Sequence, residues 1–177
     1  MKTLAILALL AVAATSVQDA PAPPAQTEQH GWLQQLVGEW TVTSEATMEP
    51  GADPMKHEGT ESVRSIGGLW IVAEGKASMP MTWLLTLVYD PLKKSFVGTW
   101  IDTMQTHLWS YLGTLDDAKK VLTLVTEGPF FGDPSKMATY RDVIEVKGVD
   151  HRTLTSSVKN EDGSWSTFLR ADYRRKK

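Results

Sequence analysis

His107 is the titratable residue of this sequence best placed to do chemistry. It lies within Thr106-His107-Leu108-Trp109-Ser110-Tyr111, and alternation along an extended strand places it on one face with Trp109 and Tyr111. A neutral imidazole in such a setting can orient a ligand or carry a proton near neutral pH. The alternative is a structural histidine whose ring is held by a backbone group or a carboxylate.

Glu74 is a charged residue inside an otherwise apolar run that begins at Leu69 and ends at Gly75. If the side chain points inward, its carboxylate needs a partner and becomes a candidate binding group. Arg141, Arg170 or His107 could provide that partner. If the side chain points outward, Glu74 is an ordinary surface charge. The apolar run is compatible with both orientations.

Tryptophan is unusually frequent, with seven residues against four phenylalanines and four tyrosines. Trp32 and Trp40 lie early in the chain, and we expect them to pack a closed end. Aromatic walls with a few convergent polar groups suit an apolar or aromatic ligand. A filled, dry core is the alternative. The predicted ligand-binding residues are Trp70, Glu74, Trp83, Trp100, His107, Trp109, Tyr111 and Tyr140.

Motifs that would identify a particular chemistry are absent from the sequence. There is no Gly-x-Ser-x-Gly elbow, no His-Glu-x-x-His, no phosphate-binding glycine loop and no calcium loop. His57 and Glu61 share a strand face, but two ligands are too few for a metal site. We therefore predict no catalytic residue and no metal site.

Strands are the elements that must position these side chains. Runs rich in Val, Thr, Trp, Tyr and Ile alternate with turn signals such as Asp90-Pro91 and Asp116-Asp117. This pattern predicts an all-β, antiparallel up-and-down barrel of about ten strands, with an open two-sheet sandwich as the alternative. A short helix over 28–36, with Trp32, Leu33 and Leu36 on one side, would plug one end. The predicted strands are 39–48, 55–66, 69–78, 81–89, 95–103, 106–115, 121–127, 137–147, 152–159 and 165–174.

Length and charge set limits on the class of protein. The 177 residues support one domain with a sizeable core, and the formal net charge of −3 argues against nucleic-acid binding. Cysteine is absent, so the fold has no disulfide and must rely on its core.

The start of the chain has the pattern of an export signal. Lys2 precedes an apolar stretch too short to span a bilayer, followed by small residues suited to a signal peptidase. We assign 1–20 to a signal peptide and its cleavage region, 21–29 to a Pro/Ala-rich linker and 30–177 to the barrel domain. The protein is then expected to be periplasmic or secreted, with no membrane-spanning segment after signal cleavage.

A Gly-x-Trp element directly before an alternating strand is how small ligand-holding barrels commonly begin. This element and several later strings together resemble a bacterial family, domain of unknown function 1579 (DUF1579), within the lipocalin-like (calycin) superfamily. The resemblance extends from about residue 30 to the C-terminus and implies a lipocalin-like barrel with no established activity. The strings are Leu36-Val37-Gly38-Glu39-Trp40, Gly67-Gly68-Leu69-Trp70, Tyr89-Asp90-Pro91, Phe96-Val97-Gly98-Thr99-Trp100, Thr106-His107-Leu108-Trp109 and Tyr140-Arg141-Asp142.

The resemblance to related barrels also bears on two residue roles. In lipocalins a late arginine stacks over the motif tryptophan, which implies that Arg170 or Arg174 closes the barrel floor over Trp40. Haem-binding barrels of the nitrobindin type are similar in size but place a ligating histidine late in the chain. The predicted last strand has no histidine, and His151 lies in a predicted turn. We therefore predict no haem and no other cofactor.

These observations favour an exported lipocalin-like protein that binds a small hydrophobic or amphipathic molecule in its barrel. One alternative is an enzyme acting on a small molecule with His107 and Glu74 as acid and base. Another is a fully packed structural protein of the cell envelope. The oligomeric state is left open.

Overall fold

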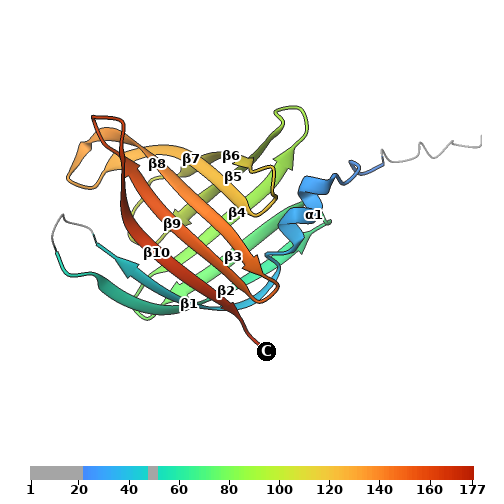
Figure 1. Ribbon diagram of the computed structural model, residues 1–177, viewed down its shortest axis with the longest axis horizontal. Coiled ribbons are helices and arrows are strands. Elements are labelled where there is room, and N and C mark those ends of the chain that lie inside the picture. The colour runs from blue at the N-terminus through green and yellow to red at the C-terminus, as the bar shows by residue number, and fades with distance from the viewer. Residues whose placement is uncertain (1–21, 48–51) are drawn as a thin grey trace, which may run out of the picture.

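The computed structural model describes residues 22–47 and 52–177, so the expected signal peptide lies outside the described residues. Ten antiparallel strands follow one another around a closed barrel, and a short helix lies at one end (Figure 1). The elements are α1 (Glu28–Gln34), β1 (Gly38–Ala46), β2 (Met55–Ile66), β3 (Trp70–Ala77), β4 (Thr82–Asp90), β5 (Ser95–Asp102), β6 (Trp109–Leu115), β7 (Val121–Phe130), β8 (Asp133–Gly148), β9 (His151–Lys159) and β10 (Trp165–Arg175).

The closure of the sheet confirms the predicted up-and-down barrel and excludes the open sandwich. β1 pairs with β10 from Trp40 opposite Arg175 to Ala46 opposite Leu169, so the first and last strands leave no free edge. The strand boundaries agree with the sequence prediction within a few residues. The largest differences are that β6 begins only at Trp109, leaving His107 before the strand, and that β8 begins already at Asp133.

Aspartates fix the tight turns that the sequence predicted. In the turn between β6 and β7, the Asp116 carboxylate accepts hydrogen bonds from the backbone amides of Lys120 and Val121 at 2.7 and 2.9 Å. These backbone hydrogen bonds lower the pKa of Asp116. Asp90 accepts comparable bonds from the amides of Leu92 and Lys93 after β4. Short side chains that accept backbone hydrogen bonds favour such turns.

Helix α1 closes one end of the barrel, as the sequence predicted. Trp32, Leu33 and the following Leu36 are buried, and the Trp32 ring meets Phe96 edge to face at 5.9 Å. The Trp32 indole N–H donates to the carbonyl of Lys119 at 2.8 Å, which ties the helix to the β6–β7 turn. No helix in the described ranges is long or apolar enough to traverse a bilayer.

Trp40 lies between two arginines at this closed end. The guanidinium carbon of Arg175 lies 4.3 Å from the centre of the Trp40 ring, and that of Arg152 lies 4.9 Å from it. Arg175 also donates to the carbonyls of Val37 at 2.6 Å and Gln35 at 3.0 Å. The cation–π contact and the backbone hydrogen bonds together hold the last strand against the segment between α1 and β1.

The expectation that Arg170 or Arg174 covers Trp40 is wrong, and the reason is local. A bulge in β10 between Thr167 and Leu169 adds one residue to the strand. One extra residue reverses which side chains face inward for the rest of the strand. Arg175 is therefore directed at the floor of the barrel, while Arg170 and Arg174 are exposed on the outer face.

A buried ion pair crosses the barrel interior above this floor. Arg152 of β9 hydrogen-bonds Glu61 of β2, with side-chain exposures of only 5% and 3%. The Trp83 indole N–H donates to the second oxygen of Glu61 at 2.9 Å, and Arg152 lies 3.9 Å from the centre of the Tyr173 ring. A buried charge is tolerated only when it is paired and hydrogen-bonded, and Glu61 meets both conditions through Arg152 and Trp83. Arg152 is paired through a terminal nitrogen, while its Nε has no hydrogen-bond partner among the described residues.

Replacing Arg152 by methionine should destabilise the protein strongly, because it leaves the Glu61 carboxylate buried without its countercharge. We expect a loss of about 3–5 kcal/mol in urea unfolding. The matched control is Arg64→Met, which breaks the exposed Arg64–Glu74 pair and should cost at most about 1 kcal/mol. Adding Glu61→Gln to Arg152→Met should restore part of the loss. An equal loss of stability from Arg152→Met and Arg64→Met would contradict the structural role of the Glu61–Arg152 pair.

Candidate functional site

Five of the eight predicted ligand-binding residues face the barrel interior. Alternation across the paired strands places them on the inner face, and four of them are almost fully buried. Trp100 keeps part of its surface accessible. The five residues are Trp83, Trp100, Trp109, Tyr111 and Tyr140.

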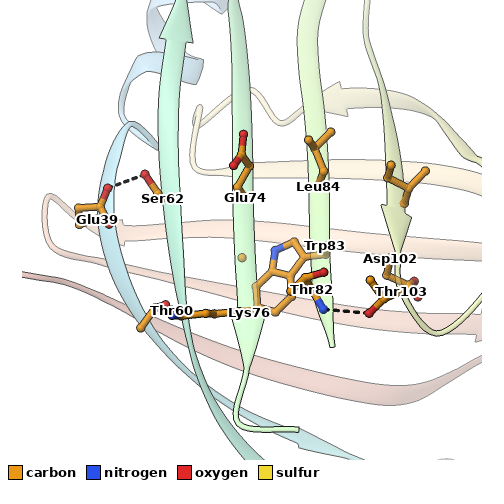
Figure 2. Close-up of a pocket in the computed structure, with 12 residues that line it drawn as sticks. Glu39, Thr60, Ser62, Glu74, Lys76, Thr82, Trp83, Leu84, Asp102 and Thr103 are labelled. Atoms are coloured by element: carbon orange, nitrogen blue, oxygen red, sulfur yellow. Dashed lines mark hydrogen bonds between the residues drawn. The ribbon is translucent and has the colours of Figure 1, made fainter. Parts of the chain in front are cut away.

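Trp83 and Trp100 form one aromatic wall of the interior. Their rings are stacked with centroids 5.8 Å apart and an interplanar angle of 15°. The Trp83 indole reaches from β4 across β3 (Figure 2), where Gly75 leaves room for it. A Cβ added at Gly75 would lie 2.0 Å from two ring carbons of Trp83. The glycine in β3 is therefore required by the position of this indole.

Trp109 and Tyr140 form a second wall nearer the end opposite α1, which we call the mouth. The mouth carries the β3–β4, β5–β6, β7–β8 and β9–β10 connections (Figure 1). The rings of Trp109 and Tyr140 meet edge to face with their centroids 5.0 Å apart, and the centroids of the Phe131 and Tyr140 rings are 5.2 Å apart. The Phe168 ring packs edge to face on Phe131, with the two centroids 4.8 Å apart. Aromatic rings thus continue from the interior to the rim of the mouth.

A hydrogen-bonded pair of Tyr111 and Asp142 lies on the interior face of β6 and β8. The Tyr111 hydroxyl donates to the Asp142 carboxylate at 2.5 Å. Burial raises the pKa of Asp142, while hydrogen bonds from Ser156 and Tyr111 act in the opposite direction. Burial and the nearby Asp142 charge hold the pKa of Tyr111 well above its usual value. Tyr111 therefore remains a hydrogen-bond donor at neutral pH.

Among residues 22–47 and 52–177, three carboxylates face the interior, and the predicted ligand-binding residues included none of them. They are Glu61, Asp102 and Asp142. Asp102 accepts hydrogen bonds from the Trp100 indole at 3.1 Å and from the Met104 amide at 2.7 Å. Strand alternation could have found two of these residues, because Asp142 follows Tyr140 by two positions and Asp102 follows Trp100 by two.

Some inward-facing side chains keep part of their surface accessible. Trp100, Asp142, Leu154 and Leu169 face inward but are only partly buried. The hydroxyl of Thr126 is buried on the inner face of β7 and has no hydrogen-bond partner among the described residues. Buried hydroxyls normally find a partner. A water or ligand atom next to Thr126 would supply one.

Trp70 and Glu74 lie on the outer face, so the expectation that they line the interior is wrong. Ile71, Ala73 and Gly75 occupy the inward positions of β3, and alternation turns the residues between them outward. Trp70 is 41% exposed. Glu74 lies 3.7 Å from Arg64 in an exposed ion pair. The apolar run misled the prediction because small and β-branched residues occupy both faces of this strand.

His107 lies at the mouth, before β6 begins. Its ring meets Trp109 edge to face at 4.9 Å, and its Nε2 lies 3.2 Å from the carbonyl oxygen of Glu127. Glu74 belongs to the outer face of β3, so the structure does not bring these two residues together as an acid and a base. Within residues 22–47 and 52–177, no three His, Asp or Glu side chains gather as a candidate metal site.

Two depressions lie on the outer surface. The larger, with a volume of about 640 Å³, follows mainly the outer faces of β1 to β5, where polar side chains such as Glu39, Glu74 and Lys76 line it (Figure 2). Its lining also includes Gly75, Trp83 and Asp102 from the inward positions of β3, β4 and β5. The smaller, about 360 Å³, lies between α1 and the β6–β7 turn near Trp32. Neither brings together the inward-facing aromatic residues described above.

Comparisons with protein families and with solved structures support the barrel fold described above. The family model described as "Protein of unknown function (DUF1579)" matches residues 25–175. No curated protein matches the chain. The crystal structure of Rv2717c from M. tuberculosis is similar, with a TM-score of 0.60 and 12% sequence identity, covering 86% of this chain and 100% of that one. This likeness concerns the fold alone.

Two further barrel structures are similar at lower scores. A redesigned β-barrel, b11L5F_LGL, has a TM-score of 0.37 and 10% identity, covering 81% of this chain and 94% of that one. The structure of EF1p2_mFAP2b bound to DFHBI has a TM-score of 0.39 and 15% identity, covering 83% of this chain and 98% of that one.

The raised pKa of Asp142 predicts how an Asp142→Asn substitution responds to pH. Below the ordinary aspartate value near 3.8 the native carboxyl is protonated in both folded and unfolded chains. As pH rises from this value to the raised folded pKa, the native protein loses stability because folding must keep the carboxyl protonated or bury its charge, and the asparagine variant does not lose it. The melting temperature of the variant relative to the native protein should therefore increase with pH and then level off. A difference that is constant from pH 3.5 to 8 would contradict this environment for Asp142.

Gly75→Ala should displace Trp83 from its position across β3. The added methyl overlaps the indole, and overpacking of this kind costs about 1–3 kcal/mol. The tryptophan emission spectrum should shift at the same time. Gly148→Ala is the matched control, because nothing lies within 4 Å of its added Cβ and the loss should stay within about 0.5 kcal/mol. An unchanged spectrum and stability for Gly75→Ala would show that the indole lies elsewhere.

Proposed function

This chain belongs to the DUF1579 family of proteins of unknown function, and from that premise we propose that its barrel binds a small hydrophobic or amphipathic ligand. The ligand enters through the mouth and contacts the walls formed by Trp83, Trp100, Trp109, Tyr111 and Tyr140. Closed barrels of this size can hold one small ligand in their interior. Ligand sites are typically apolar and aromatic with a few polar groups.

The observation that carries the proposal is the difference between the two halves of the interior. The half beneath α1 is packed with apolar side chains, among which Leu33, Leu87 and Leu122 have no accessible surface. The half towards the mouth combines aromatic walls with the partly accessible Asp142 and the unpartnered hydroxyl of Thr126. A protein that required only a stable core would gain nothing from leaving a buried hydroxyl unsatisfied. This difference favours binding over the fully packed structural alternative.

The enzyme alternative depends on Glu74 and His107 acting together as acid and base. Glu74 lies on the outer face of β3, and His107 lies at the mouth beside Trp109. An acid and a base that act on one substrate must both reach it within hydrogen-bond distance. Binding therefore explains the described residues better than catalysis by this pair.

We further propose that the protein acts outside the cytoplasm. The basis is the pattern of 1–20, with Lys2 before a short apolar stretch that is followed by small residues. Fractionation of cells expressing the full chain would test this, and retention of the uncleaved chain in the cytoplasm would contradict it.

Ligand binding should change tryptophan emission, because the ligand contacts indole rings directly. Titrating the protein with dodecanol should give a saturable change in emission. Trp109→Phe should weaken the affinity about tenfold, which corresponds to the loss of one aromatic contact of roughly 1.4 kcal/mol. Trp70→Phe on the outer face is the matched control and should leave the affinity unchanged. Equal weakening by both substitutions, or no saturable change with the native protein, would contradict binding inside the barrel.

A further inference from the structure

We propose that the barrel selects amphipathic ligands whose head group is a cation, such as a primary amine, over ligands of equal length with a carboxylate head. This inference rests on the proposed ligand-binding function and specifies the chemistry of the ligand. The inference is based on where the charged side chains lie. Acidic side chains predominate on the inner faces of the strands, and most basic side chains lie on the outer faces.

The inward-facing charges are unbalanced. Glu61, Asp102 and Asp142 face the interior, whereas the basic group among them is Arg152, which is paired with Glu61. His57 occupies an inward position of β2 opposite Ser44, four pairs nearer the mouth than Trp40. Arg175 is held at the floor by the carbonyls of Val37 and Gln35. The other basic residues of the strands lie outside or near the ends, namely Lys56, Arg64, Lys76, Lys136, Arg141, Lys147, Lys159, Arg170 and Arg174.

Two carboxylates are therefore left without a cation among the residues that the structure describes. Asp142 is hydrogen-bonded by the neutral hydroxyl of Tyr111 at 2.5 Å. Asp102 accepts from the Trp100 indole, the Met104 amide and the Gln105 side-chain amide, the last at 2.9 Å. Both side chains are only partly buried. A carboxylate has more acceptor sites than these donors occupy, so each can accept a further hydrogen bond from an ammonium group.

The aromatic walls favour the same head group. A cation is attracted to the negative face of an indole or phenol ring, and the attraction increases when water is excluded. Trp100 is partly accessible, and one face of its ring is stacked on Trp83, so a cation could approach the other face. A carboxylate head would meet two negative charges and the faces of electron-rich rings instead.

Arg152 cannot serve as the anchor for an acidic ligand. Its guanidinium is bound by Glu61 and stacks against Tyr173 at 3.9 Å and Trp40 at 4.9 Å. Binding a ligand carboxylate there would separate Glu61 from its partner and leave that charge buried, which is strongly unfavourable. Arg152 is thus held by contacts within the protein, as Arg175 is at the floor.

The test compares three ligands of equal chain length on the full chain at pH 7. Dodecylammonium, dodecanol and dodecanoate are each titrated below micelle formation, with tryptophan emission and calorimetry as readouts. We expect dodecylammonium to bind at least about tenfold more tightly than dodecanoate, with dodecanol between them. Equal or tighter binding of dodecanoate would overturn the cation selectivity while leaving the proposed binding function intact. Failure of all three to bind would contradict the proposed function, and the selectivity with it.

Two charge-neutralising variants and a control variant test which carboxylates cause the preference for dodecylammonium. Asp142→Asn and Asp102→Asn keep the size and acceptor oxygen of the side chain but remove its charge. At least one should reduce the preference for dodecylammonium about tenfold, and the double variant should abolish it. Glu74→Gln removes one charge from the outer face and should leave the preference unchanged. A full preference in the double variant, with a cooperative thermal transition showing that it is folded, would overturn the assignment of the head-group site.

Discussion

The pairing of β1 with β10 is the constraint on which the rest of this structure depends. It closes the sheet, and a closed sheet divides every strand into an inner and an outer face with no edge between them. Trp40 supports this closure from the inside, because its ring is held between Arg175 of the last strand and Arg152 of β9. Its indole N–H also donates to the carbonyl of Leu36 at 2.9 Å, which fixes the chain entering β1.

The closed barrel is built in two halves with different physical chemistry. Beneath α1, aliphatic and aromatic side chains such as Leu33, Leu122 and Phe96 exclude water and supply the hydrophobic stabilisation. Above them, Glu61 and Arg152 form a hydrogen-bonded ion pair in the interior. A buried ion pair of this kind is weak evidence for stability, because apolar residues of similar volume often pack as well. Its presence, together with the interior carboxylates that have no cation among the described residues, supports the ligand-binding function proposed above.

Strand alternation carried most of the sequence prediction and also explains where it failed. Trp109 and Tyr111 were identified because large aromatic residues repeat at an interval of two along this strand, and Tyr140 because alternation places it on one face with Ile144. In β3 the signal was ambiguous, since Ile71, Val72 and Ala73 are all buried and both faces are apolar. Glu74 consequently could not be assigned to a face. Asp102 and Asp142 were within reach of the same reasoning, but their short polar side chains resemble turn or surface residues in sequence.

The sequence by itself determined the number of strands, their approximate limits, the helix that closes one end and the family resemblance. These features depend on local periodicity, turn chemistry and the burial of apolar faces, all of which are recorded in neighbouring residues. The tertiary structure alone decided which arginine covers Trp40, because a single bulge between Thr167 and Leu169 reverses the faces of β10. It also decided that Glu61 meets Arg152 and that Tyr111 meets Asp142. Glu61 and Arg152 lie on strands that only the pairing of β1 with β10 brings near each other, whereas Tyr111 and Asp142 meet across β7 because both face inward.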